Sequence, residues 1–263
     1  MYKTISKLAN LQIGKLTNYY YLCSDKINAM HPKKIIKIVV IILLPLGIQL
    51  FASGKNKMRP IKEVIIDHQD EDMYVTDETI RRTIFKDPQA PQPIGLLKLR
   101  EIENLLDNND MIEKSEVFYT LDGVLNAKVK QRQPIARVYD NGTVYYMDTQ
   151  GKKMPLSSSY SARVPLLKGE CNKYWEDTYR LMMFIQNDMW LNENITEVTV
   201  KNNGEYHFLM RIPHFTVLFG RFEDEQMKKA NLKAFYKQLE KMNLLNEYSI
   251  VNLKYTNQVV CKR

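Results

Sequence analysis

The sequence predicts an α+β protein: a single N-terminal transmembrane helix, a small domain with the order strand, helix, helix, strand, strand, and a second mixed β domain with two helices. Three observations lead to this fold class. They are an apolar run of about 20 residues, a change from helical to alternating periodicity, and regularly spaced turn residues in the second half. The length of 263 residues leaves room for about two domains outside the membrane.

Most of the positive charge lies at the start of the chain. Up to Lys37 there are seven lysines and one acid, a balance of +6 out of a net charge of +8, which leaves +2 for the remainder. A near-neutral body with charges of both signs lacks the basic surface that binds phosphate backbones. The sequence therefore predicts no nucleic-acid partner, and we expect residues 1–34 to form a basic cytoplasmic tail.

The apolar run, residues 35–54, has the length of a helix that crosses a bilayer. A cleaved signal peptide is the alternative, since Ala52 and Gly54 could flank a cleavage site. However, more than 30 residues precede the run, whereas a signal peptide begins with a short charged segment. A buried core helix is disfavoured, because no amphipathic partner segment precedes residue 60. We expect an uncleaved anchor with a cytoplasmic N-terminus, because lysines precede the run.

Residues 59–133 form the first predicted domain. Residues 61–67 alternate as a strand, and a helix should follow from Thr76, whose hydroxyl suits an N-cap. A proline-rich loop at 87–95 separates this helix from a second one, whose apolar residues recur at helical spacing. The turn at 122–123 then predicts a hairpin.

Residues 134–263 form the second predicted domain, which begins with strands. Turns at 140–142 and 148–151, rich in Asp, Asn and Gly, predict hairpins. The stretch MPLSSSYSARVPLLKG, residues 154–169, ends in an apolar segment that predicts a short buried strand, with Gly169 turning the chain. We interpret this stretch as a structural connection.

Helices and strands alternate in the remainder of the chain. One amphipathic helix is predicted through residues 171–190, because its apolar positions fall on one stripe. That stripe consists of Thr178, Met182, Ile185 and Met189. Three strands are predicted within residues 195–220, then a helix from about Glu225 to Met242, and finally a closing strand.

No residue pattern indicates catalysis or a cofactor. Ser157, Ser158 and Ser159 lack a nucleophile elbow, and the later histidines, His207 and His214, lie in strand-like contexts. No glycine-rich phosphate loop occurs. We therefore expect a protein that is not an enzyme and that binds no small-molecule substrate or cofactor.

The cysteines show no metal-type spacing. Cys171 is far in sequence from both His207 and His214, so we expect no metal site. A disulfide between Cys171 and Cys261 stays open, because an oxidising compartment would permit it.

The first domain resembles the POTRA domain, the polypeptide-transport-associated module, by its element order. The chain as a whole resembles the FtsQ/DivIB family of bacterial cell-division proteins. Five segments carry this resemblance in order: VKQRQPIARVY, YYMDTQGKKMP, RVPLLKG, FGRFEDEQMKKANLKAFYKQL and IVNLKYTNQVV. The resemblance implies a POTRA-like domain at residues 59–133 and an FtsQ-type β domain at 134–263.

The resemblance also implies a function. A family member is a non-enzymatic, single-pass scaffold of the divisome in the bacterial cytoplasmic (inner) membrane at the division septum, with its C-terminal domains extracytoplasmic. Such a scaffold recruits FtsB and FtsL and couples division-site assembly to septal peptidoglycan synthesis. A partner would add a strand to the terminal strand of the sheet. The implied contact residues are Lys254, Tyr255, Thr256, Asn257, Gln258, Val259 and Val260.

Two other classes of protein stay open. One is a POTRA-bearing membrane or secretion assembly factor. The other is an enzyme that acts on cell-wall material.

Overall fold

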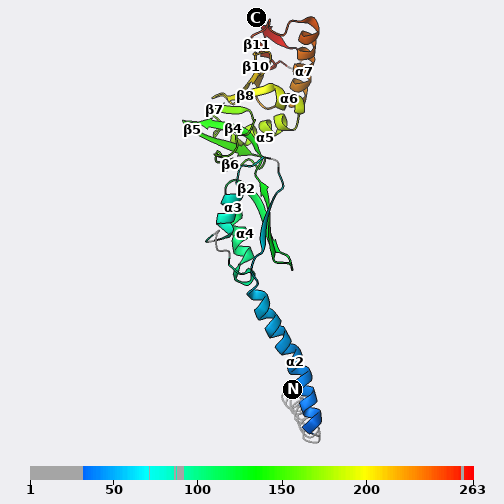
Figure 1. The fold of residues 1–263 in the computed structure, drawn as a ribbon. Coiled ribbons are helices and arrows are strands. Elements are labelled where there is room, and N and C mark those ends of the chain that lie inside the picture. Colours follow the sequence, from blue (N-terminus) through cyan, green and yellow to red (C-terminus); the bar gives the residue numbers. More distant parts are fainter. Residues whose placement is uncertain (1–31, 71, 86, 88–91, 256–257) are drawn as a thin grey trace, which may run out of the picture. The chain divides into compact units, whose positions relative to one another are not determined.

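The computed structural model describes residues 32–70, 72–85, 87, 92–255 and 258–263. The predicted basic tail therefore lies outside the described residues up to residue 31. The chain divides into two compact units: residues up to 59 together with 93–96, and residues 60–92 together with 97–263. Figure 1 shows that the described chain contains both helices and strands, and all of the strands belong to the second unit. The predicted α+β class is confirmed.

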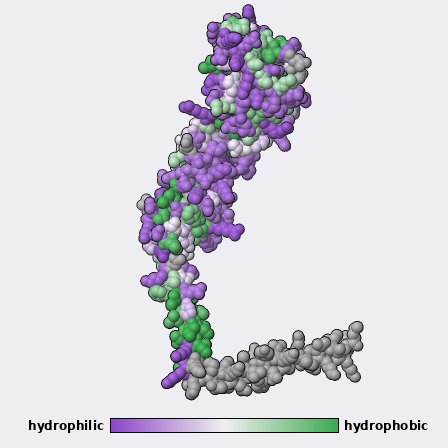
Figure 2. Space-filling model, turned by 90° about the vertical axis from the view of Figure 1, so that its right-hand side faces the viewer, coloured by the Kyte–Doolittle hydropathy of each residue, from purple (hydrophilic) through white to green (hydrophobic). Residues whose placement is uncertain are grey.

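The first unit contains helix α2, Pro32–Lys57, and the short 3-10 helix η1, Ile94–Leu96. Within α2, the 20 residues Ile36–Lys55 have a mean hydropathy of 2.2 and are long and apolar enough to cross a membrane. Their large apolar side chains are exposed, and Figure 2 shows the helix as a hydrophobic surface. The apolar helix predicted at residues 35–54 is therefore present.

A three-stranded sheet and two helices begin the second unit. The strands β1 (Glu63–His68), β2 (Ile112–Tyr119) and β3 (Val124–Gln131) lie in the order β1-β3-β2, with β1 parallel and β2 antiparallel to β3. Helices α3 (Asp77–Ile84) and α4 (Leu99–Asp107) connect β1 to β2. The predicted order of strand, helix, helix, strand, strand is confirmed.

Local signals and burial explain these elements. The Thr76 hydroxyl accepts a hydrogen bond from the Thr79 N–H at 3.3 Å, as the predicted N-cap of α3 should. One stripe of each helix is buried against the inward residues of the strands. The buried core of this part consists of Val75, Ile80, Ile84, Phe85, Ile102, Leu106, Ile112, Val117, Leu125, Ala127 and Val129.

A nine-stranded sheet follows, in the order β12-β11-β10-β9-β8-β7-β4-β5-β6. Its strands are β4 (Pro134–Asp140), β5 (Thr143–Asp148), β6 (Lys153–Met154), β7 (Leu166–Gly169), β8 (Ile195–Val200), β9 (Tyr206–Met210), β10 (Thr216–Gly220), β11 (Ile250–Asn252) and β12 (Val260–Lys262). The pairs β4/β7, β7/β8 and β10/β11 are parallel, and the others are antiparallel. The predicted hairpins, the short strand before Gly169 and the three strands β8 to β10 are all present.

Gly169 ends β7 with a φ of +91°, a left-handed conformation that a glycine adopts without strain. A Cβ atom at this position would also collide with the carbonyl oxygen of Val200 on the neighbouring strand. The next residue, Glu170, donates its N–H to that same carbonyl at 3.0 Å. The predicted turn therefore requires glycine both for its backbone angle and for its closeness to β8.

Three helices, not the two predicted, pack on this sheet: α5 (Trp175–Gln186), α6 (Met189–Asn194) and α7 (Glu225–Met242). The prediction of a single helix through residue 190 is wrong, because helix α5 ends at Gln186 and helix α6 begins after Asp188. The Asp188 carboxylate accepts from the Leu191 N–H at 3.1 Å and starts a new helix. Met189 consequently leaves the apolar stripe and is 77% exposed.

The single closing strand is also wrong. The chain forms two short strands, β11 and β12, which pair antiparallel with Val251 opposite Cys261. Leu253 is buried after β11, and its N–H donates to the Leu218 carbonyl at 3.0 Å. The chain turns back after this point, so the sheet ends in a hairpin.

Candidate partner-binding edge

Strand β12 forms one end of the nine-stranded sheet. It pairs with β11 on one side, and no strand within the described part of the chain pairs with its other side. Val260 is exposed, whereas Cys261 is half-buried against the main core. An edge of this kind offers backbone N–H and C=O groups to which a further extended chain can bind.

Five of the seven sequence-predicted contact residues are described by the structure, and these five lie around the edge without forming one strand. Lys254 and Tyr255 follow β11, Gln258 and Val259 precede β12, and Val260 begins β12. Thr256 and Asn257 lie outside the described residues. Of the described residues in the strand expected at 254–260, only Val260 belongs to a strand, and the edge strand β12 is shorter than expected.

A groove lies between helix α7 and the segment that leads into β12. Its volume is about 560 Å³. Gln258 and Val259 line one side, and α7 supplies the other side with Met227, Asn231, Ala234, Phe235 and Gln238. The lining combines four apolar side chains with three amide side chains, Asn231, Gln238 and Gln258, which suits an amphipathic peptide segment better than a small charged ligand.

The five groove residues of α7 were not among the predicted contacts. They recur at intervals of four, three, one and three along the helix, which places them on one face. Phe235 is only partly buried and stacks edge-on against Tyr248 at 5.9 Å. The sequence signal was a mixed apolar and amide face beside the buried positions Leu232 and Leu239, but periodicity does not show what packs on such a face.

An ion pair holds the segment after β11 against the sheet. Lys254 binds Glu205, which lies in the turn between β8 and β9. This hydrogen bond lowers the pKa of Glu205, although burial acts in the opposite direction. The Lys254 N–H also donates to the Asn252 side chain at 3.0 Å. Both contacts fix the chain direction just before the exposed Tyr255.

Lys228 is a second basic residue near this edge, and its contacts are structural. It is 7% exposed, its Nζ atom donates to the Arg221 carbonyl at 2.9 Å, and it lies 4.8 Å from the centre of the Phe219 ring. Burial lowers its pKa, and the acids that precede and begin α7 partly offset the change. The side chain therefore fastens the start of α7 to β10.

The serine-rich stretch is a structural connection, as interpreted. The Ser157 hydroxyl donates to the Tyr74 carbonyl at 2.7 Å, in the segment between β1 and α3. Ala162 N–H donates to the Tyr146 hydroxyl at 3.1 Å, and Arg137 donates to both the Tyr146 and Ser161 hydroxyls. The loop thus joins the two sheets, and its contacts within the described residues include no histidine.

The other residues considered for chemistry lie apart from one another. No group of three or more His, Cys, Asp or Glu side chains that could hold a metal ion occurs among the described residues. Cys171 and Cys261 are free thiols, and burial raises the pKa of Cys171 to about 12. Burial also lowers the pKa of His207. These residues are therefore parts of the sheet and its packing.

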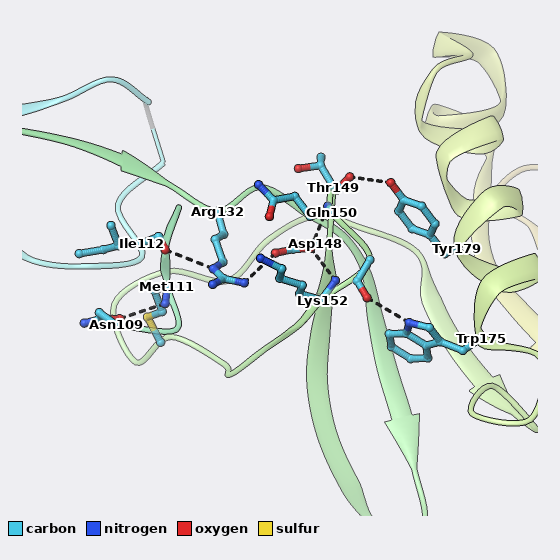
Figure 3. A network of polar contacts seen from close by, with 11 residues as sticks. Asn109, Met111, Ile112, Arg132, Asp148, Thr149, Gln150, Lys152, Trp175 and Tyr179 are labelled. Carbon is cyan, nitrogen blue, oxygen red and sulfur yellow. Dashed lines mark hydrogen bonds and ion pairs between the residues drawn. The ribbon is translucent and has the colours of Figure 1, made fainter. Parts of the chain in front are cut away.

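A polar network links the three-stranded sheet to the turn after β5 (Figure 3). Arg132 donates from Nε to the Ile112 carbonyl and from Nη1 to Asp148, each at 3.2 Å. Asp148 also accepts the N–H groups of Gln150 and Lys152. This network fixes the junction between the three-stranded sheet and the β5 end of the nine-stranded sheet. Strand β12 lies at the opposite end of the nine-stranded sheet.

The same turn also contacts helix α5. The Trp175 indole N–H donates to the Gly151 carbonyl at 3.0 Å, and the Tyr179 hydroxyl donates to the Thr149 carbonyl at 2.9 Å (Figure 3). The turn at residues 148–151 therefore connects the three-stranded sheet, the nine-stranded sheet and helix α5.

Comparison with known proteins supports one family. Residues 133–262 match the family model described as FtsQ/DivIB, C-terminal related. A search of curated proteins finds no match. A similar solved structure is the major extracytoplasmic domain of the trans isomer of the cell division protein DivIB from Geobacillus stearothermophilus, with 14% identity, a TM-score of 0.31, and coverage of 42% of this chain and 95% of that chain. A TM-score this low does not establish a common fold.

Proposed function

Over residues 133–262 the chain belongs to the FtsQ/DivIB-related family, and from this premise we propose that it is a non-enzymatic scaffold of bacterial cell division. The family match indicates a role in cell division. The absence of a recognisable catalytic motif in the sequence supports a role in binding. The scaffold would recruit other division proteins and couple their assembly to septal peptidoglycan synthesis.

The proposed location is the bacterial cytoplasmic membrane at the division septum. Helix α2 would be the single span, because Ile36–Lys55 has the required length and hydropathy. The seven lysines up to Lys37 favour a cytoplasmic N-terminus. Both sheets would then be extracytoplasmic.

The proposed domain boundaries are 59–133 for a POTRA-like domain and 134–263 for an FtsQ-type β domain. Two observations support them: each range has a sheet of its own, and each sheet has its own buried cluster. The order β1-β3-β2 with two helices between β1 and β2 supports the POTRA comparison. Docking of other polypeptides is what this module would contribute.

The proposed partners are FtsB and FtsL, and the proposed mechanism is strand addition at β12. One observation carries it: an edge strand without a second neighbour in the described residues lies beside a groove lined by one face of α7. A partner strand would bind β12 through main-chain hydrogen bonds, and an adjoining amphipathic segment would occupy the groove. Lys254, Tyr255 and Val260 would flank the added strand, along with the other predicted edge residues.

The test is capture of the native FtsB/FtsL pair by the full chain in detergent. Ala234→Arg places a long charged side chain in the groove at an exposed helix position, so we expect capture to weaken at least tenfold. Tyr255→Ala should also weaken capture, because Tyr255 is 52% exposed beside the edge.

Ala230→Arg is the matched control, since Ala230 is exposed on the same helix but does not line the groove. It should capture the pair as well as the unmodified chain. Equal capture by the Ala234→Arg and Ala230→Arg variants, both folded, would rule out the groove. Failure of the unmodified chain to capture either partner would rule out the proposed partners.

A further inference from the structure

A second hollow, which we name the arginine pocket, lies at the ends of three neighbouring strands. Its volume is about 400 Å³. Pro165 precedes β7, Ile195 begins β8 and Arg211 follows β9, and these strands are adjacent in the sheet. The lining consists of Arg163, Val164, Pro165, Asn192, Ile195, Thr196 and Arg211. Three segments that are distant in sequence, 163–165, 192–196 and residue 211, therefore build this pocket, and none of them belongs to the proposed docking edge.

The charge of the pocket has one sign. Arg163 and Arg211 are its charged lining residues, and no acidic side chain lines it within the described part of the chain. Glu197, next to the lining residue Thr196, is already paired with Lys168 at 2.7 Å. The two guanidinium groups therefore create a positive potential that no lining carboxylate cancels.

Arg211 is held in place by the protein backbone. Its N–H donates to the Asn194 carbonyl at 2.6 Å, and its Nε donates to the Glu193 carbonyl at 2.7 Å. Its two terminal nitrogens have no hydrogen-bond partner among the described residues. Arg163, in the segment that precedes β7, makes no hydrogen bond or ion pair with a described residue. A guanidinium group that is already oriented can donate to a planar carboxylate with little loss of side-chain entropy.

The other lining residues favour a side chain over a free ion. Ile195 and Pro165 are buried and apolar, so they place an apolar surface beside the two exposed arginines. The Asn192 side chain has no hydrogen-bond partner among the described residues, so it can add a donor. Next to Arg211 in the chain, Ile212 is 64% exposed and offers an apolar contact.

We propose that the arginine pocket binds an acidic side chain, Glu or Asp, that is flanked by apolar residues in a partner polypeptide. The pocket would act as a second contact point on the nine-stranded sheet. It is independent of whether a partner adds a strand at β12, because it lies on β7, β8 and β9.

The test measures binding of a fluorescein-labelled peptide, Ala-Leu-Glu-Leu-Ala, to the full chain in detergent by fluorescence polarisation at low salt. A twin peptide with Gln in place of Glu differs only in the charge. We expect the Glu peptide to bind at least tenfold more tightly than the Gln peptide. The double variant Arg163→Gln/Arg211→Gln should reduce that ratio to about one.

The matched control is Arg100→Gln/Lys201→Gln, which removes the same charge from two exposed positions outside the pocket. It should keep the preference for Glu. Equal binding of the two peptides to the unmodified chain would overturn the proposal, as would a preference for Glu that survives loss of both pocket arginines. Neither result depends on capture of FtsB or FtsL, so the two proposals fail separately.

Discussion

Asp148 shows at the scale of one residue how a side chain can join distant parts of this chain. Its carboxylate is 1% exposed, accepts the N–H groups of Gln150 and Lys152 at 2.9 and 2.8 Å, and pairs with Arg132 at 3.2 Å. A buried carboxylate is stable only when such donors surround it. Asp148 therefore closes its own turn and binds the residue that follows β3.

Replacing Asp148 by Ala should lower the free energy of unfolding by about 3 kcal/mol, because it leaves a largely buried arginine without its partner and two N–H groups without an acceptor. Urea unfolding of the full chain, followed by circular dichroism, measures the change. Asp122→Ala is the control, since Asp122 lies in the turn of the other hairpin and is exposed. Its effect should stay within about 0.5 kcal/mol. An equally small effect at Asp148 would contradict this reading of the network.

At the scale of the element, Asp188 decides where one helix ends and another starts. Its carboxylate caps α6 and pairs with two lysines of α7, Lys233 at 2.8 Å and Lys229 at 3.3 Å. Burial opposes ionisation of this carboxyl. The hydrogen bonds from Lys233, the Leu191 N–H and Lys229 outweigh that effect and hold the pKa of Asp188 below its ordinary value.

This lowered pKa predicts a pH dependence. A carboxyl whose pKa is lower in the folded state stabilises the fold at neutral pH, and this contribution is lost as the pH falls from about 4 through the folded pKa. Asp188→Asn keeps a capping side chain but cannot ionise. The variant should be less stable than the unmodified chain at pH 7, and the difference should shrink at about pH 3.

Thermal unfolding at the two pH values measures this difference. Asp177→Asn is the control, because Asp177 pairs with Arg180 on an exposed face of α5 and is 57% exposed. It should change stability little at either pH. A gap between Asp188→Asn and the unmodified chain that is the same at both pH values would show that the lysine pairing has no role in stability.

The elements show which parts of the fold could be predicted from sequence. Strand alternation, the Thr76 cap, the hairpin turns and the bounds of α7 depend on residues close in the chain, and they are confirmed. The break at Asp188 combines a local cap on the Leu191 N–H with ion pairs to Lys229 and Lys233, more than 40 residues away, whereas apolar periodicity predicted one continuous helix. The hairpin at the end was missed because β11 pairs parallel with β10, a long-range contact without a local signal.

The same distinction applies to the candidate site. Gln258 and Val259 were predicted as contacts and line the groove, because they lie next to the terminal strand. Packing between distant segments brings the α7 residues into the groove. It also places Arg163 and Arg211 in the same pocket. Sequence periodicity can assign a residue to a helix face but does not show what packs on it.

At the scale of the whole molecule, the second unit has two large buried clusters that follow the order of the chain. One lies on the three-stranded sheet with residues between Val75 and Val129, and the other lies on the nine-stranded sheet with residues between Ile135 and Leu253. Each cluster has its own strands and helices. We therefore expect the two parts to open separately.

Leu125→Ala tests this expectation. Leu125 is fully buried in the first cluster, so its truncation should cost about 3 kcal/mol in that part. Hydrogen–deuterium exchange should accelerate about a hundredfold in β1, β2 and β3 and little in β8 to β10. Phe208→Ala, at a buried position of the second cluster, should show the opposite pattern. Equal acceleration of both sheets by either variant would mean that they unfold as one body.

The short length of β12 limits the affinity of any polypeptide strand that binds to it. A strand of three residues spans about 10 Å and can share only a few main-chain bonds with a neighbour. Because each such bond adds little net free energy in water, a complex held by this strand alone would dissociate quickly. A long residence time would then require several weak contacts made together, and losing one of them would shorten it. A scaffold of the proposed kind would then bind its partners reversibly.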